Sequence, residues 1–96
     1  MKIIYSPEAS EDIKSLYYFI SEVQGAQQAA TDVVSKIKSA VKELKIFPNR
    51  HRVWDGSGFR FFPVCGYYVF YRFNELTETI HIERVIHSRR NIDELI

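Results

Sequence analysis

His87, Arg89 and Arg90 are the residues whose types and spacing give this chain its clearest capacity for chemistry. An imidazole titrates near neutral pH, and guanidinium groups bind phosphate or carboxylate oxygens through paired hydrogen bonds. The three residues follow a run rich in β-branched side chains, so we expect them at the end of a strand that aims them outward. By themselves they predict an anionic or carboxylate-rich partner.

The remaining arginines divide into candidates for binding and candidates for pairing. Every lysine of the chain precedes every arginine, which places the planar, hydrogen-bonding cations in its second half. We expect Arg60 to act with the C-terminal cluster. For Arg72 and Arg84 we expect ion pairs across strands with neighbouring carboxylates, namely Asp55, Glu75, Glu78 and Glu83.

The histidines and the cysteine predict no metal site. His51, His81 and His87 share no metal-ligand spacing, and Cys65 is the only cysteine. A zinc site needs several such donors at short intervals, so we assign no metal and no cofactor. Cys65 precedes Gly66 at a predicted hairpin, where we expect the thiol to pack rather than to act as a nucleophile.

The composition predicts one globular domain. The chain has 96 residues, of which 46% are hydrophobic and 15% aromatic, and its net charge of +1 identifies no partner. We expect a single domain over residues 1–96 with a modest core, not a disordered chain. No apolar run approaches the roughly 20 residues that cross a bilayer. Together with the lone cysteine and the start MKIIYS, which has no signal peptide, this predicts a soluble, cytoplasmic protein.

Four segments have the character of strands. They are rich in aromatic and β-branched residues, and short polar or glycine-containing turns separate the last three. Alternation in the last segment predicts Ile80 and Ile82, continuing to Arg84 and Ile86, on one face, with the residues between them on the other. The segments are Lys2–Tyr5, Phe59–Val64, Tyr67–Phe73 and Thr79–Ile86.

Two helices are predicted between the first and second strands. Ser6, Pro7 and Glu8 form a typical helix start, with Ser6 as the N-cap. Apolar residues then recur at helical spacing from Ala9 to Ile20 and, after Gly25, from Ala26 to Leu44, until Pro48 stops the pattern. A short connection makes the pair an antiparallel hairpin.

The predicted order is β-α-α-β-β-β, an α+β fold in which a helical hairpin packs on a small, mostly antiparallel sheet. The first strand reaches an edge or the centre of the sheet through the hairpin. Asn91 could cap a last helical turn. The only long loop, Asn49–Ser57, carries Trp54, which is either a lid over the hairpin or an exposed interface anchor.

In the order of its predicted elements and motifs, the chain resembles the ParE/RelE toxin superfamily, and it resembles ParE toxins more closely than RelE nucleases. The resemblance covers essentially the whole chain. It is carried by motifs spread along the sequence: Ser6-Pro7-Glu8-Ala9, Tyr17-Tyr18-Phe19-Ile20, Phe47-Pro48-Asn49, Gly58-Phe59-Arg60, Tyr67 to Arg72, and Ile82 to Arg90.

The resemblance implies the toxin of a type II toxin-antitoxin system. ParE-like members bind DNA gyrase, stabilise its cleaved-DNA complex and block replication, which needs placed cations rather than a general base. On this reading Arg60, His87, Arg89 and Arg90 bind gyrase or its DNA. A ParD-like antitoxin, with a DNA-binding N-terminus and a wrapping C-terminal tail, would neutralise the toxin. We expect it to contact aromatic residues: Tyr17, Tyr18, Trp54, Tyr68 and Tyr71.

Two alternatives remain open. RelE-like members cleave mRNA on the ribosome, which requires an acid, a base and cations beside the phosphate. Here His87, Arg60, Arg84 and Arg89 could serve, but Ser88 follows His87 and no aromatic residue follows Phe73. The second alternative is a non-toxic RNA-binding or scaffold domain, in which sheet tyrosines stack on bases.

Overall fold

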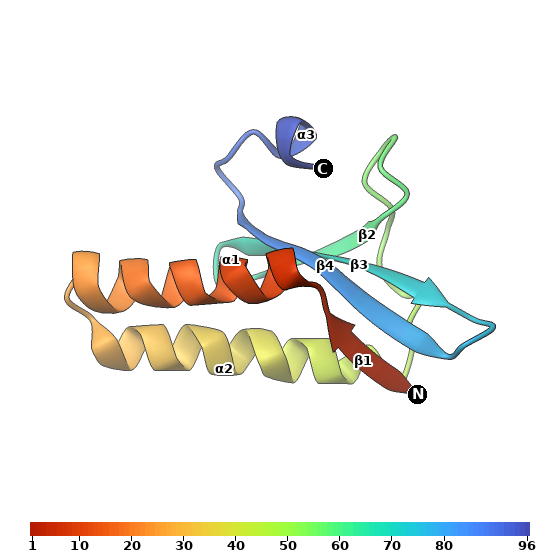
Figure 1. Ribbon diagram of the computed structural model, residues 1–96, viewed down its shortest axis with the longest axis horizontal. Coiled ribbons are helices and arrows are strands. Elements are labelled where there is room, and N and C mark those ends of the chain that lie inside the picture. Colours follow the sequence, from red (N-terminus) through yellow and green to blue (C-terminus); the bar gives the residue numbers. More distant parts are fainter.

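The apolar runs of the sequence form a four-stranded sheet with a helical hairpin on one face, as the computed structural model of residues 1–96 shows (Figure 1). A π-helical turn, η1, ends the first helix, and one helical turn ends the chain. This is the predicted α+β fold. The elements are β1 (Lys2–Tyr5), α1 (Pro7–Tyr18), η1 (Phe19–Val23), α2 (Gln27–Glu43), β2 (Arg60–Val64), β3 (Tyr67–Asn74), β4 (Thr79–His87) and α3 (Ile92–Leu95).

The sheet has the strand order β1-β4-β3-β2. Strands β2, β3 and β4 form two successive antiparallel hairpins, as predicted. Strand β1 lies at one edge and pairs in parallel with β4, with Tyr5 opposite Ile82. A parallel pair requires a crossover connection, and the helical hairpin supplies it.

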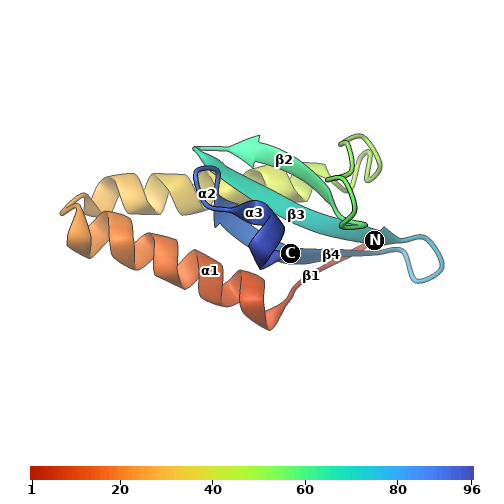
Figure 2. The ribbon, with the colours of Figure 1, turned by 90° about the horizontal axis from the view of Figure 1, so that it is seen from above.

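The start of α1 follows the predicted capping pattern. The Ala9 N–H donates to the Ser6 Oγ at 2.9 Å, and Pro7 stands in the first turn, where a missing N–H costs nothing. The π-helical turn was not predicted. Gly25, with φ of 68°, then lets the chain reverse into α2. Figure 2 shows α1 and α2 running side by side beyond the end of the sheet.

The main core lies between the helical hairpin and one face of the sheet. Tyr71 is fully buried there, and its hydroxyl donates to the Pro48 carbonyl at 2.7 Å, which ties the end of the hairpin region to β3. This cluster contains thirteen buried residues: Ala9, Leu16, Ile20, Ala30, Ile37, Val41, Leu44, Phe62, Val69, Tyr71, Ile80, Ile82 and Val85.

A β-bulge changes which face the last part of β4 presents. Phe70 pairs with Arg84 while Tyr71 pairs with Ile82, so Glu83 has no partner on β3. The extra residue reverses the alternation beyond it. Val85 therefore joins the main core, and the prediction that Ile86 shares the face of Ile80 and Ile82 is wrong.

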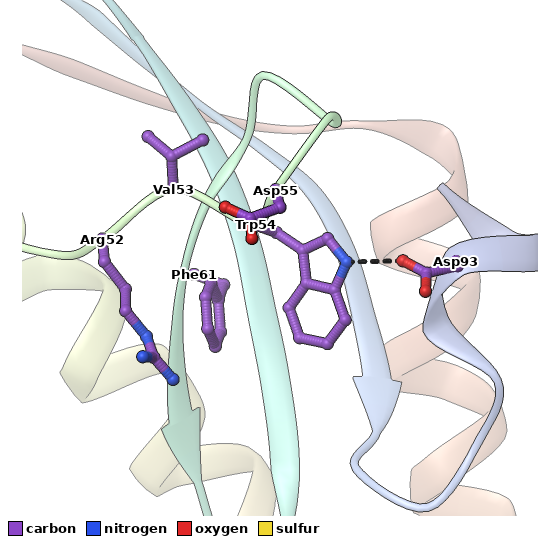
Figure 3. Close-up of a pocket in the computed structure, with 6 residues that line it drawn as sticks. All are labelled: Arg52, Val53, Trp54, Asp55, Phe61 and Asp93. Atoms are coloured by element: carbon purple, nitrogen blue, oxygen red, sulfur yellow. Dashed lines mark hydrogen bonds between the residues drawn. The ribbon is translucent and has the colours of Figure 1, made fainter.

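A second, smaller cluster covers part of the opposite face of the sheet. Its four buried residues are Phe61, Phe70, Ile86 and Ile92, and Trp54 packs against them. The indole Nε1–H of Trp54 donates to the Asp93 carboxylate of α3 at 2.7 Å (Figure 3). Of the two alternatives for Trp54, the lid over the helical hairpin is excluded, because Trp54 lies on the face that the hairpin leaves free.

The C-terminal segment forms the predicted helical turn. Asn91 stands at its N-cap position, but its side chain makes no capping hydrogen bond. In Figure 1 α3 lies on the side of the strands away from α2. None of the helices is long and apolar enough to span a membrane.

Candidate functional site

His87, Arg89 and Arg90, which were expected at the end of the last strand, line one cleft there. The cleft has a volume of about 510 Å³ and runs between α1 and the end of β4. We call it the basic cleft. Its lining comprises Asp12, Ser15, Leu16, Phe19, Tyr67, Val85, Ile86, His87, Arg89 and Arg90.

A tight turn after β4 places the basic side chains of the cleft. The Ser88 N–H donates to the Gly66 carbonyl, and the Arg90 N–H donates to the His87 carbonyl, each at 3.0 Å. The Arg89 N–H donates to His87 Nδ1 at 3.1 Å. That contact assigns the acceptor lone pair to Nδ1 and leaves Nε2 to carry the proton of the neutral ring. His87 therefore organises the turn locally.

Arg89 and Arg90 are exposed, and neither forms a salt bridge. Their guanidinium groups keep their hydrogen-bond donors for a ligand. His87 is also exposed, with its ring edge-on to Tyr67 at 5.2 Å between centroids. The rim of the cleft therefore has two unpaired cations and one imidazole.

The floor of the basic cleft is apolar. Leu16 and Val85 are buried there, and Phe19 is 47% exposed beside them. Burial raises the pKa of the Tyr67 phenol, so this side chain stays neutral at physiological pH. An apolar floor under a cationic rim suits a partner segment that carries both an apolar and an anionic group.

Asp12 is the only carboxylate in the cleft, and its charge is balanced by Arg84. Arg84 donates from Nε to Asp12 Oδ2 at 2.8 Å and from Nη2 to Oδ1 at 3.1 Å. The hydrogen bond to Asp12 raises the pKa of Arg84. Asp12 therefore does not offset the charges of Arg89 and Arg90.

The structure does not bring Arg60 to the basic cleft. Arg60 pairs with Tyr71, whereas His87 pairs with Tyr67 at the other end of β3. These positions are separated by roughly 13 Å along the strand, from about 3.3 Å per residue. The Arg60 Nη1 donates to the His51 carbonyl at 2.6 Å, so the side chain holds the preceding loop in place.

Arg72 and Arg84 both form ion pairs, but only the pair of Arg72 is the expected one across strands. Arg72 pairs with Glu83 at 3.3 Å, as predicted. Arg84 pairs instead with Asp12 of α1, which is outside the four predicted partners. Because both oxygens of Asp12 engage it, the Arg84 side chain is not available to hold a phosphate in a nuclease site.

The five aromatic residues expected to bind an antitoxin have different environments. Tyr18 is 62% exposed near the end of the helical hairpin, while Tyr17 is half-buried against the main core. Trp54 and Tyr68 are half-buried together on the opposite face, 5.9 Å apart between ring centroids. Tyr71 is fully buried, so the expectation of a surface contact there is wrong.

The cysteine lies at the β2–β3 turn, where Cys65 and Gly66 have φ values of 52° and 83°. Both central residues with positive φ are typical of a type I′ hairpin turn. The thiol is exposed, so the expectation that it packs is wrong. No group of His, Cys, Asp and Glu side chains has the arrangement of a metal site.

Two features of the site were missed in the sequence. Asp12 lies within an amphipathic helical pattern, in which a carboxylate is normally predicted to be exposed to solvent. Its partner, Arg84, is distant in sequence. The exposed apolar end of the hairpin, Tyr18, Phe19 and Val23, is 47–63% exposed. Phe19 and Val23 belong to the unpredicted π-helical turn, and Tyr18 is the last residue of α1 before it.

One comparison with known proteins identifies the family of this chain. A family model for the ParE toxin of the type II toxin-antitoxin system, parDE, matches residues 3–92. No curated protein sequence matches the chain.

Solved structures share the fold. The chromosomal ParDE toxin-antitoxin system from P. aeruginosa is similar with a TM-score of 0.75 at 20% identity, covering 91% of this chain and 95% of that one. The intact RelBE toxin-antitoxin complex of E. coli is similar with a TM-score of 0.69 at 12% identity, covering 93% and 98%. A YoeB/ParE toxin from Agrobacterium tumefaciens has a TM-score of 0.62 at 13% identity, covering 91% and 98%.

Proposed function

This chain belongs to the ParE toxin family of type II toxin-antitoxin systems, and we propose that it poisons DNA gyrase by binding through the basic cleft. The proposal assigns His87, Arg89 and Arg90 to contact with gyrase or its cleaved DNA. Stabilising a cleaved complex requires affinity for that complex and no proton transfer by the toxin.

One observation carries the proposal: two unpaired arginines and an imidazole share a cleft with an apolar floor and no free carboxylate. Such a site binds strongly to an anionic partner. The separation of Arg60 and the pairing of Arg84 remove two of the three arginines expected beside a cleaved phosphate, so that only Arg89 of that set stays with His87. This favours a binding role over catalysis.

The proposal is tested with purified toxin, gyrase and supercoiled plasmid DNA. We expect toxin to increase the fraction of linear, gyrase-linked DNA, and replacement of Arg89 and Arg90 by alanine to abolish the increase. A double variant that traps as much cleaved DNA as the native toxin would show that the cleft is not the gyrase site.

The proposed neutralising partner is a ParD-like antitoxin whose C-terminal tail wraps the toxin. The exposed Tyr18, Phe19 and Val23 offer it an apolar surface at the end of the helical hairpin, and the arginines of the adjoining cleft offer it charge. Phe19 lines the basic cleft, so a tail bound there would reach both surfaces. Tyr18→Ser with Val23→Ser should weaken antitoxin binding while growth arrest by free toxin persists.

A ribosome-dependent mRNA endonuclease is the second candidate. The observation in its favour is the exposed imidazole of His87 beside two arginines, the residue types that proton transfer and phosphate binding use. Site-specific cleavage of ribosome-bound mRNA by purified toxin, with unaffected gyrase, would establish it and displace the proposal above.

A further inference from the structure

The edge of β4 changes its neighbour where β1 ends. Tyr5 is the last β1 residue opposite β4, and the Ser6 N–H donates to the Ile82 carbonyl at 2.9 Å. From Glu83 onward no strand lies on that side of β4. An unpaired strand edge leaves backbone groups without partners, which destabilises the edge or invites another strand.

Side chains from the start of α1 take over the role of the missing strand. The Ser6 Oγ–H donates to the Glu83 carbonyl at 2.8 Å. The Val85 N–H donates to Asp12 Oδ2 at 2.9 Å. Asp12 therefore supplies the hydrogen-bond acceptor that the carbonyl of a neighbouring strand would otherwise provide. This contact is made at Val85, shortly before His87 in the sequence.

The same carboxylate fixes a second point through Arg84. Arg84 engages both Asp12 oxygens, and its Nη1 donates to the Leu95 carbonyl at 3.2 Å. The side chains of Arg84 and Asp12 are only 23% and 17% exposed. Exposed ion pairs contribute little, whereas a mostly buried, bidentate pair holds one geometry.

We propose that Asp12 is a positioning residue for the basic cleft, holding the segment 86–94 at both of its ends. Val85 fixes the segment at its start, and the Leu95 carbonyl, reached through Arg84, fixes it at its end. His87, Arg89 and Arg90 lie between these two points. The inference deepens the proposed function and rests on it, because it assigns the target-binding role to the same cleft.

Other contacts also hold this segment. The Ser88 N–H donates to the Gly66 carbonyl at the β2–β3 turn, Trp54 bonds Asp93 at an exposed position, and Ile92 is buried in the second cluster. None of these contacts involves the helical hairpin. Among the hydrogen bonds of the segment and its two end points, those through Asp12 are the ones that reach α1.

The test compares Asp12→Ala with Asp32→Ala. Asp32 is an exposed carboxylate on α2 whose only side-chain contact is with Gln28, so its replacement removes the same charge elsewhere. Hydrogen exchange is measured on purified toxin alone. In Asp12→Ala we expect exchange at Val85, Ser88 and Arg90 to rise about tenfold or more, with Ile37 and Val41 unchanged.

Arg84→Gln separates the two fixed points. The Asp12 carboxylate remains to accept from Val85, so exchange at Val85 should stay slow, while exchange at Ile96 rises as the hold on Leu95 is lost. In cells without antitoxin, grown well below the melting temperature of either variant, Asp12→Ala should need about tenfold more toxin than Asp32→Ala for the same growth arrest.

Unchanged exchange over residues 85–90 in Asp12→Ala would overturn the inference, as would an equal rise in α2, which would make Asp12 a general stabiliser. Native growth arrest by a variant with loosened residues 85–90 would also overturn it. If native toxin never traps gyrase-linked DNA, the proposed target fails, while exchange and growth arrest still decide the role of Asp12.

Discussion

The two faces of the sheet differ in how firmly they are covered. Two helices of twelve and seventeen residues pack on one face and form with it a cluster of thirteen buried residues, whereas a loop and a four-residue helix form a cluster of only four with the other face. Long amphipathic helices remove far more apolar surface from water than one helical turn does. We infer that one face supplies most of the stability and that the other can open locally.

The basic cleft lies at the boundary between these two regions. Its floor belongs to the firmly covered side, through Leu16 and Val85, but its arginines lie on the turn that leads into α3. A binding site of this kind has a rigid base, but its cations lie on a segment that the main core does not hold. Other contacts must fix the position of that segment. This explains why a single carboxylate, Asp12, can matter at the cleft.

The largest expected effect compares the same change on both faces. Ile37→Ala removes a fully buried side chain from the main core and should lower the free energy of unfolding by about 2–5 kcal/mol. Ile92→Ala removes a buried side chain from α3, where the short segment can relax around the cavity. The loss of unfolding free energy should therefore lie at or below the lower end of that range. Urea unfolding measures both. Equal losses would refute the difference between the faces.

The second prediction separates stability from binding at the cleft. Arg89→Ala with Arg90→Ala should change stability by no more than about 0.5 kcal/mol per site, as at ordinary surface positions. Target binding should weaken about a hundredfold, which corresponds to about 3 kcal/mol for two charge-assisted contacts.

Thermal melting and growth arrest without antitoxin measure the two quantities. Lys36→Ala with Lys45→Ala removes two exposed charges from the α2 region and is the matched control. His87→Ala should lower both stability and toxicity, because it also removes the acceptor of the Arg89 N–H. A folded arginine double variant with native toxicity would exclude the cleft from the mechanism.

A smaller effect is expected where Trp54 holds α3. Trp54→Phe keeps an aromatic ring in the second cluster but loses the bond to Asp93, so unfolding should become easier by about 1 kcal/mol. Exchange at Ile96 should rise. Asp93→Asn retains an acceptor oxygen and should behave nearly as the native protein does. Greater loss in Asp93→Asn than in Trp54→Phe would contradict this account.

The smallest effect concerns pH. Burial, and then the charge of Arg50, lower the pKa of His51, which stacks on Phe62 at 4.6 Å. The unfolded chain then binds a proton more readily, so this contribution to stability is present above about pH 6.5 and is lost as the pH falls below it. When the pH is lowered from 7.5 to 5.5, the free energy of unfolding of His51→Phe, measured with urea, should fall less than that of the native protein. Equal decreases in the two proteins would argue against a role of His51.

The predictable parts of this fold are those set by local patterns. The Ser6 cap, the two helical stripes and the turn-separated strands depend on neighbours in sequence, and all of them form as expected. The grouping of His87, Arg89 and Arg90 also follows from adjacency. Arg60 was expected to act with them, but strand register puts it at the other end of the sheet.

The bulge at Glu83 explains the main structural error. Strict alternation assumes that each residue of one strand pairs with one residue of its neighbour. The extra residue in β4 breaks this rule, so the side chains after Ile82 lie on the opposite face from the one predicted. Nothing in the run from Ile80 to Ile86 marks that extra residue, because apolar side chains occur in both registers. A pairing between two strands is a property of both, and neither strand specifies it alone.

The sequence by itself determined the α+β fold class, the elements and the position of a basic cluster at the end of the last strand, because periodicity, caps and turns act over a few residues. Only the tertiary structure decided which arginines stay unpaired, that Trp54 covers the second face, and that Asp12 reaches Arg84 and Val85 across 72 and 73 positions. Such contacts depend on how the helical hairpin docks against the edge of β4, where β1 ends and α1 begins. Local patterns carry no record of that docking, since it is fixed by the packing of the whole core.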